Sequence, residues 1–369
     1  MNKVLFLNKF APHYRKGIFV AMDRELGVDF YFGDKKPGVK KLDYSYLHNF
    51  KKELKNIYIT KSVYYQQGAI GLLFKPYKKY IIMGDMGSIS VWIILLLSKL
   101  TRKEVYLWAI GWFGYESKLK KVFKRIFFGL ADSVFLYGDY ARKSMIEYGF
   151  NADKLYVLYN SLDYDSQLVI RNQLQKNDVY IRQFHNTNPN IIFIGTLLIR
   201  KKLGLLINAV ARLKSENFFV NVTILGDGVD RDHLKSMVNE YDLNDTFFFY
   251  GACYDEKIIA DYIFNADVGV SPGICGLTTM HMFAYGTPVI THNNMVKQGP
   301  ESEAIIPEET GALFQENDVD SLAETIKIWL TKFSDKREIV RQNCYKIIDE
   351  KYNPHQQIKI MKHTMNIKQ

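Results

Sequence analysis

The chain has 369 residues, of which 47% are hydrophobic and 24% charged, so it is long enough for two domains with cores of their own and is not intrinsically disordered. Residues 1–160 contain 27 Lys and Arg against 13 Asp and Glu, whereas residues 161–369 contain 22 against 26, so the net charge of +10 belongs to the first part. A basic part favours an anionic partner, such as nucleic acid, anionic lipid or a phosphate-linked acceptor, unless the charge serves solubility alone.

Apolar runs of strand length alternate with longer mixed stretches throughout the first part. The runs are residues 4–7, 28–32, 57–59, 80–83, 105–108, 134–137 and 155–158. Residues 17–26 and 118–131 have helix length and lie between such runs. Strands separated by helices predict a parallel sheet in an α/β domain.

Three stretches of the first part bear on membranes. Residues 1–7 lead directly into a strand and lack the apolar core and cleavage site of a signal peptide. Residues 89–97 are fewer than the roughly 20 that a spanning helix requires, so we expect a buried helix with a basic C-terminal end. Residues 118–128 interleave basic and apolar side chains, which is typical of a helix on an anionic membrane or of a core helix with a solvated basic edge.

In the second part the alternation restarts after a polar stretch at residues 160–189. Strands are predicted at 191–195, 220–226, 246–250, 268–270 and 288–291, with helices at 203–215, from 230, from 256 and at 279–285. We therefore expect two doubly wound α/β domains, at residues 1–165 and 166–349, which face each other across a cleft that holds the site. The last helix, at about 350–369, is expected to pack back on the first domain.

The cysteines Cys253, Cys275 and Cys344 are odd in number, far apart and without His or Cys neighbours at metal-ligand spacing. They predict thiols in a reducing cytoplasm, without a disulfide or a metal site. A basic first domain would place such a protein peripherally on the inner face of the cell membrane.

Residues 271–290 hold the densest group of chemically informative residues, Ser-Pro-Gly-Ile-Cys-Gly-Leu-Thr-Thr-Met-His-Met-Phe-Ala-Tyr-Gly-Thr-Pro-Val-Ile. A strand ends at Ser271, a turn follows, and we expect a helix to start near Thr278 as its N-cap and to stop at Gly286. Backbone N–H groups at such a helix start suit a diphosphate. A glycine turn that only terminates the strand is the alternative.

The second part also resembles the donor domain of family 4 glycosyltransferases, which have the GT-B fold. The segments that carry the resemblance follow the family's order: 193–195 with Lys201, 206–209, 224–228, 250–251, 265–272, 276–281, 285–290, and Glu303 ahead of 310–311. Residues 271–273, 276–281, 30–33 and 158–163 resemble a branch of that family found among bacterial surface-polysaccharide genes.

The resemblance implies transfer of a sugar from a UDP- or GDP-linked donor to a glycan or lipid-linked glycan, with retention of anomeric configuration and without a metal or other cofactor. The departing diphosphate would take the acceptor's proton, while the protein stabilises charge and positions the reactants. The positions implied to bind the donor are Gly195, Thr196, Gly228, Gly273, Gly276, Leu277, Thr278, Thr279 and Glu303.

The sequence departs from the family's pattern at its usual pair of glutamates, where Gly273 and His281 stand. His281 retains hydrogen-bonding capacity towards a ribose hydroxyl, or it is a structural histidine. Thr196 replaces the family's common arginine, which leaves Lys201 and Arg200 to neutralise the charge of the leaving diphosphate, unless this basic run is only a solvated face. The predicted catalytic residues are therefore Lys201, Arg200 and His281.

On the acceptor side we predict His13, Arg15, Gly17 and Trp112, because the turn after the first strand faces the same cleft in this topology. The alternative is a loop that is merely basic. The family's histidine between Trp108 and Gly111 is missing here, so that role is not transferred.

Other functions remain open at this point. Asp163 and Asp165 have the Asp-x-Asp form of metal-dependent glycosyltransferases of another fold, but they lie at the domain junction, so metal-independent chemistry is favoured. The lost glutamates favour a catalytically inactive partner in a glycan-assembly complex. A sugar-nucleotide epimerase or phosphorylase would use the same donor domain, and charge alone suggests nucleic-acid binding, for which the second part has no recognition motif.

Overall fold

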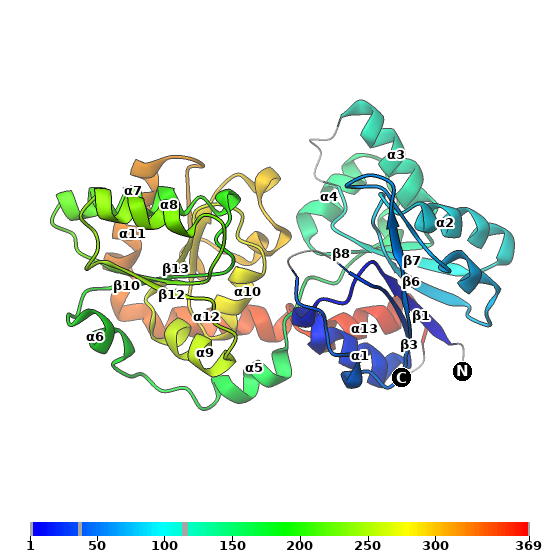
Figure 1. The fold of residues 1–369 in the computed structure, drawn as a ribbon, viewed down its shortest axis with the longest axis horizontal. Helices are drawn as coiled ribbons and strands as arrows, with labels where there is room; N and C mark the ends of the chain where they lie inside the picture. The colour runs from blue at the N-terminus through cyan, green and yellow to red at the C-terminus, as the bar shows by residue number, and fades with distance from the viewer. Residues whose placement is uncertain (1–2, 36–38, 113–116, 368–369) are drawn as a thin grey trace. The chain divides into compact units, whose positions relative to one another are not determined.

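The computed structural model describes residues 3–35, 39–112 and 117–367. The chain divides into two compact units, unit 1 (Met1–Asp163 and Tyr352–Gln369) and unit 2 (Tyr164–Lys351). The sequence placed the boundaries after residues 165 and 349. Both units are α/β, and each has one large parallel sheet (Figure 1).

Unit 1 has a seven-stranded parallel sheet of order β3-β2-β1-β6-β7-β8-β9. Its strands are β1 (Val4–Asn8), β2 (Asp29–Gly33), β3 (Phe50–Leu54), β6 (Lys79–Met83), β7 (Glu104–Ala109), β8 (Ser133–Leu136) and β9 (Leu155–Val157). Its longer helices are α1 (Lys16–Leu26), α2 (Ile89–Thr101), α3 (Lys118–Gly129), α4 (Asp139–Glu147) and α13 (Pro354–Thr364). A separate antiparallel pair joins β4 (Asn56–Tyr58) to β5 (Tyr64–Gln66).

The two faces of the unit 1 sheet have separate cores because successive side chains of a strand point to opposite faces. Leu5 and Leu7 of β1 pack with the buried residues of α2 and α3. Phe6 of the same strand packs with those of α1 and α13, where Met361 is fully buried. The C-terminal helix therefore completes the core of the first unit.

Unit 2 has a six-stranded parallel sheet of order β12-β11-β10-β13-β14-β15. The strands are β10 (Asn190–Ile194), β11 (Asn221–Leu225), β12 (Phe247–Gly251), β13 (Val268–Ser271), β14 (Val289–His292) and β15 (Gly311–Phe314). Numbered within the unit, this is the doubly wound order 3-2-1-4-5-6, whose direction reverses between β10 and β13. Ligands of such sheets bind at the carboxyl ends of the strands at that point.

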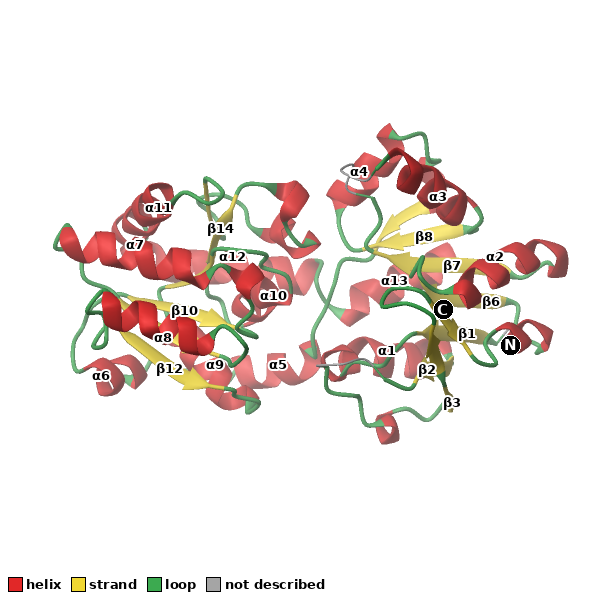
Figure 2. Cartoon of the chain, turned by 45° about the horizontal axis from the view of Figure 1, so that its top comes forward, coloured by secondary structure: helices red, strands yellow, loops and turns green. Residues whose placement is uncertain are grey.

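The helices of unit 2 lie on both sides of this sheet (Figure 2). They are α5 (Tyr164–Arg171), α6 (Val179–Phe184), α7 (Leu203–Ser215), α8 (Arg231–Glu240), α9 (Glu256–Asn265), α10 (Leu277–Ala284), α11 (Val319–Lys332) and α12 (Arg337–Glu350). Local chemistry sets several starts: Asp255 accepts from the backbone N–H of Lys257 at 2.9 Å, and Asp318 accepts from that of Ser321 at 2.9 Å.

The structure departs from the sequence predictions at four elements. The predicted strand at 57–59 belongs to the β4–β5 hairpin and not to the parallel sheet, whose edge is the unpredicted β3. The sequence also missed β15. The predicted buried helix, α2, is buried on one side only, because Leu96 and Leu100 on its other side are exposed. Among the described residues, no helix is long and apolar enough to cross a bilayer.

Candidate functional site

The switch point of unit 2 brings two loops together. One follows β10 and leads through a short 3-10 turn (Ile199–Lys201) into α7, and the other follows β13 and leads into α10. The strands that carry them are neighbours, with Ile191 beside Val268. The predicted donor residues Gly195, Gly273 and Gly276 therefore lie at one edge of one sheet.

Glycine is required where the loop after β10 crosses the loop after β11. A Cβ on Gly226 would lie 1.9 Å from the carbonyl oxygen of Gly195, and a Cβ on Gly228 would lie 2.3 Å from that of Leu197. The backbone N–H of Leu197 donates to the carbonyl of Asp227 at 3.0 Å. These contacts fix the course of residues 195–197, so Gly228 acts by allowing this close approach.

Gly273 is packed against the turn that carries the basic residues. A Cβ there would lie 2.1 Å from the carbonyl oxygen of Arg200 and 2.9 Å from the Cα of Lys201. Its N–H donates to the carbonyl of Lys201 at 3.0 Å. The backbone of the turn thus occupies the space in which the family's glutamate side chain would start.

Lys201 points towards the loop that precedes α10. Its Nζ donates to the carbonyl of Ile274 at 2.7 Å and to that of Cys275 at 3.3 Å. Burial lowers the pKa of the Lys201 ammonium. The neighbouring Arg200 side chain is exposed, as is Thr196. The two basic residues therefore differ: Lys201 is hydrogen-bonded to the loop before α10, and Arg200 faces solvent.

The helix α10 begins two residues earlier than an N-cap at Thr278 would place it. Gly276, with φ 57°, is the N-cap and Leu277 is the first helical residue, so the prediction that Thr278 caps the helix is wrong. The Thr278 hydroxyl instead donates to the carbonyl of Ile194 at 3.0 Å, and Thr279 is fully buried. The Thr278 hydroxyl therefore ties the helix to the end of β10 and does not cap it.

Gln298, which was not among the predicted site residues, holds the loop between β13 and α10 through hydrogen bonds. Its buried amide donates through Nε2 to Thr291 Oγ1 at 2.7 Å and accepts through Oε1 from the N–H of Cys275 at 3.1 Å. Burial raises the pKa of the Cys275 thiol to about 11, so this cysteine is a neutral packing residue. Gly276, next along, lies against Gly299, one residue after Gln298.

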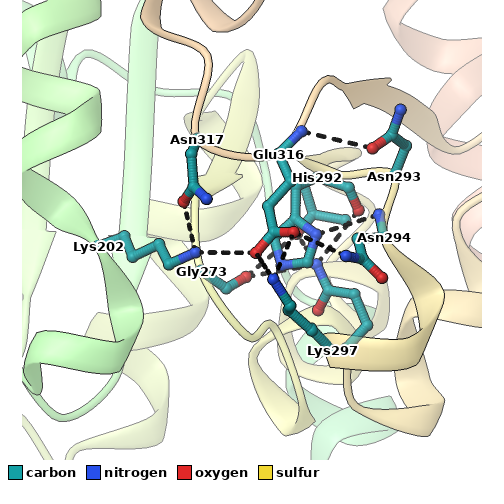
Figure 3. A network of polar contacts seen from close by, with 10 residues as sticks. Lys202, Gly273, His292, Asn293, Asn294, Lys297, Glu316 and Asn317 are labelled. Carbon is teal, nitrogen blue, oxygen red and sulfur yellow. Dashed lines mark hydrogen bonds and ion pairs between the residues drawn. The ribbon is translucent and has the colours of Figure 1, made fainter. Parts of the chain in front are cut away.

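A second unpredicted residue, Glu316, holds the basic turn from the other side (Figure 3). It accepts hydrogen bonds from Asn294 Nδ2 at 2.7 Å and forms ion pairs with Lys202 and Lys297, each at 3.1 Å, with its side chain 9% exposed. Lys202 has φ 52° and also donates to Asn317 Oδ1 at 2.6 Å. The hydrogen bond from Asn294 and the two lysines lower the pKa of Glu316 to about 2. The carboxylate therefore fixes the strained residue that ends the turn.

His281 contacts a carboxylate of its own unit. Its Nε2 lies 2.8 Å from Glu256 Oε1, which also accepts from the Tyr285 hydroxyl at 2.7 Å and from Gln167 Nε2 at 2.9 Å. Burial raises the pKa of Glu256, but His281 and these hydrogen bonds outweigh it and hold the pKa at about 2. This arrangement ties α5, α9 and α10 together. A contact between His281 and a ribose stays a prediction. It would have to be made by the other ring nitrogen, Nδ1, because Nε2 lies beside Glu256.

Glu303 lies half-buried on a 3-10 helix (Pro300–Ala304), which packs against α10. The same helix carries Glu301, a buried carboxylate that the sequence analysis passed over. The signal that identifies Gln298, Glu301 and Glu316 is polar burial, which appears only in the folded chain.

The acceptor-side candidates of unit 1 lie around a 3-10 turn, His13–Arg15, at the carboxyl end of β1. The Arg15 guanidinium lies over the Trp108 ring at 5.0 Å and hydrogen-bonds the Tyr137 hydroxyl. A Cβ on Gly17 would lie 2.8 Å from the carbonyl oxygen of Leu162, so this glycine permits close packing. His13 Nδ1 lies 3.2 Å from the carbonyl of Lys40. The structure gathers these three residues in one place.

Trp112 is placed differently. Its side chain is 2% exposed and its ring packs against Tyr148 at 4.7 Å, in the core of unit 1. It therefore presents no open surface to an acceptor.

The first carboxylate of the Asp-x-Asp pair has a structural contact, because Asp163 forms an ion pair with Lys16 at 3.2 Å. Over the described part of the chain, no group of three or more His, Cys, Asp or Glu side chains is arranged to hold a metal ion.

Comparison with known proteins finds a family match within unit 2. Residues 176–347 match the family described as Glycosyl transferases group 1. The chain is also 25% identical over 236 residues to an uncharacterized 41.2 kDa protein in the cps region of Klebsiella pneumoniae, a match that covers 62% of this chain and 60% of that relative.

Solved structures share the fold of the whole chain at low sequence identity. HepE of Anabaena, solved in complex with UDP, has a TM-score of 0.73 at 14% identity, with 99% of each chain covered. A glycosyltransferase from Rickettsia africae has a TM-score of 0.74 at 16% identity, and the lipopolysaccharide outer core galactosyltransferase WaaB has 0.71 at 14%, both again with 99% of each chain covered. Most of unit 2 therefore resembles the group 1 glycosyltransferases, and the chain has the GT-B fold of these solved structures.

Proposed function

We propose that the protein transfers a sugar from a UDP- or GDP-linked donor to a glycan or lipid-linked glycan acceptor. One observation carries this proposal: the N-terminus of α10 lies at the switch point, beside the turn of Arg200 and Lys201. A diphosphate is the ligand that such a combination suits, because helix N-termini and basic side chains both favour its charge.

In this reaction the bond between the anomeric carbon and the diphosphate oxygen breaks, and a bond from that carbon to the acceptor oxygen forms. The acceptor's proton passes to the departing diphosphate, so no carboxylate base is needed, and anomeric configuration is retained. The N–H groups of Leu277 and its neighbours, with Arg200 and Lys201, would take the role that a metal has in other transferases.

Several findings support the substrate class. HepE, which shares the fold, is a protein solved with UDP-glucose as well as with UDP. The Klebsiella relative comes from a cps region, which supports an acceptor in surface-polysaccharide synthesis. The cysteines are free thiols, and two of them are buried, which supports a reducing, cytoplasmic location for the reaction.

A catalytically inactive partner in a glycan-assembly complex is the second candidate. Gly273 favours it, because the backbone of Arg200 and Lys201 leaves no room for a side chain that could contact the donor sugar. A sugar-nucleotide epimerase would use the same donor site and would release nucleotide without an acceptor.

Calorimetric titration of the full chain with UDP, GDP and their sugar derivatives, with and without EDTA, tests the proposal. Lys201→Met keeps the stem of the side chain and removes its charge, so we expect about tenfold weaker binding of the preferred nucleotide. Lys346→Met, on the exposed side of α12, is the matched control and should bind as the unmodified protein does.

The outcomes separate the candidates. Binding that survives EDTA, followed by NMR detection of a retained linkage on added acceptor, supports the transferase. Binding without transfer to any acceptor supports the inactive partner, and nucleotide release without acceptor supports the epimerase. No binding at millimolar ligand by folded protein would overturn the donor site itself.

A further inference from the structure

The helix α2 of unit 1 has an outer apolar face that the described residues leave uncovered. Its inner side buries Val91, Ile94 and Leu95 against the sheet. Its outer side carries Leu96, 54% exposed, and Leu100, 81% exposed. A helix that is apolar on both sides normally lies in a core or in lipid, and α2 is in neither position within its own unit.

The neighbouring helix α3 has an apolar stripe that also faces outward. Leu119, Val122, Phe123 and Ile126 follow the spacing of one helical face, and all four are exposed. The helix is held by Phe127 and Phe128, which are the residues it buries. The stripe is therefore additional to the packing face and does not contribute to the core.

The two outer faces are continuous. The Trp92 ring of α2 lies 4.9 Å from that of Phe127 and 6.5 Å from that of Phe123 on α3. Between the helices is a largely apolar groove of about 500 Å³, lined by Met86, Ile89, Trp92, Ser117, Leu119, Lys120 and Phe123. Both views of the chain draw α2 and α3 on the same side of unit 1 (Figures 1 and 2). We call this surface the α2–α3 face.

Positive charge surrounds the α2–α3 face. The helix α3 contains five basic residues and no acidic one: Lys118, Lys120, Lys121, Lys124 and Arg125. At the end of α2 stand Lys99, Arg102 and Lys103. Asp132 forms an ion pair with Lys99 at 2.8 Å, and Lys121 donates to the Tyr148 hydroxyl at 2.9 Å. Unit 1 as a whole contains 30 Lys and Arg against 14 Asp and Glu.

We propose that the α2–α3 face docks onto the surface of a bilayer that contains anionic lipid. Apolar side chains on a basic amphipathic surface enter the boundary between headgroups and acyl chains, while Lys and Arg contact the lipid phosphates. Neither helix is long enough to span the bilayer, so the contact is peripheral. A second copy of the chain fits less well, because two basic faces of the same sign repel one another.

This surface lies outside the donor site, and its test does not depend on the proposed reaction. The full chain is sedimented with vesicles of phosphatidylcholine, with and without phosphatidylglycerol, at low and at high salt. We expect binding to the anionic vesicles that weakens as salt rises, because exposed charges are screened.

Three variants identify the face. Leu96→Gln/Leu100→Gln/Leu119→Gln removes exposed apolar contacts without altering buried residues, and Lys118→Gln/Arg125→Gln removes charge. Each should weaken binding to anionic vesicles about tenfold. Ile328→Gln/Ile339→Gln replaces exposed apolar residues of unit 2 and should leave binding unchanged.

Equal binding to neutral vesicles, or no binding to either kind, would overturn the proposal. So would variants that bind as the unmodified protein does while thermal unfolding shows that they are folded. Sedimentation velocity supplies the remaining outcome: a dimer that the leucine variant dissociates would assign the face to a second copy instead of lipid.

Discussion

Gly273 explains at the level of one residue why the family's first glutamate is missing. The turn of Arg200 and Lys201 is packed so closely against it that even a methyl group would meet the Arg200 carbonyl at 2.1 Å. In this chain the backbone of the basic turn therefore occupies the space that a side chain at position 273 would need. Restoring the glutamate alone would not restore the family's site.

We predict that Gly273→Ala lowers the free energy of unfolding by about 1–3 kcal/mol, because the added Cβ must displace backbone atoms. Gly273→Glu should cost more and should weaken nucleotide binding. Thermal unfolding and titration with the preferred nucleotide measure both effects. Gly129→Ala is the control, since a Cβ there meets nothing within 4 Å in a helix. A Gly273→Glu variant as stable as the unmodified protein, with tighter donor binding, would contradict the packing argument.

At the scale of elements, the site depends on where a turn ends and where a helix begins. The turn before α7 ends at Lys202 in the left-handed region, a conformation that costs a lysine energy and must be held by its surroundings. Glu316, on the loop after β15, supplies that support, and Gln298 does the same for the loop before α10. Two loops far along the chain therefore position the residues that we assign to the diphosphate.

We predict that Glu316→Gln lowers the free energy of unfolding by about 1–3 kcal/mol at pH 7, because Lys202 and Lys297 lose the carboxylate with which they form ion pairs. The folded pKa of about 2 lies below the ordinary value of 4.5, so the contribution of Glu316 is complete above pH 4.5 and is lost as pH falls towards 2. Denaturant unfolding across this range should show the two proteins converging at low pH.

A matched control exists in the ion pair between Glu308 and Lys332, which is exposed. Glu308→Gln should leave the free energy of unfolding nearly unchanged, because an exposed ion pair contributes little to stability. If Glu316→Gln were as mild as Glu308→Gln at pH 7, the network of Figure 3 would be a surface feature without a positioning role.

At the scale of the whole molecule, the C-terminal segment, residues 352–369, belongs to unit 1 and contributes to the core and to the net charge of that unit. The helix α13 covers α1 through Ile358, Met361 and Met365, and its buried Gln357 accepts from the Ser161 hydroxyl at 2.7 Å. With this segment, unit 1 contains 30 Lys and Arg against 14 Asp and Glu, and unit 2 contains 19 against 25. The charge asymmetry of the sequence is thus a difference between units.

We predict that Met361→Ala destabilises unit 1 by about 2–5 kcal/mol, because it leaves a cavity between α13 and α1. Hydrogen exchange followed by mass spectrometry should show faster exchange in peptides of unit 1 and no change in those of unit 2. Lys359→Ala, on the exposed side of α13, is the control. Faster exchange spread equally over both units would mean that the C-terminal segment does not belong to unit 1 alone.

The sequence by itself determined the α/β class and the alternation of most strands and helices, because apolar runs and their spacing are local properties. It also located the glycines and the basic turn at the switch point of unit 2, since glycine and charge are visible in the chain. It missed β3, whose residues Lys51, Lys52 and Glu53 lack an apolar run, and it assigned residues 57–59 to the wrong sheet. Strand pairing is set by partners that are distant in sequence.

Only the tertiary structure decided what each polar side chain contacts. Gln298 and Glu316 became recognisable through burial and through partners on other loops, and His281 through its contact with Glu256. The N-cap of α10 is Gly276 and not the predicted Thr278, because the threonine hydroxyl donates to the end of β10. The outer face of α2 could not be predicted either, because an apolar run reports hydrophobicity and not which of its sides the fold leaves uncovered.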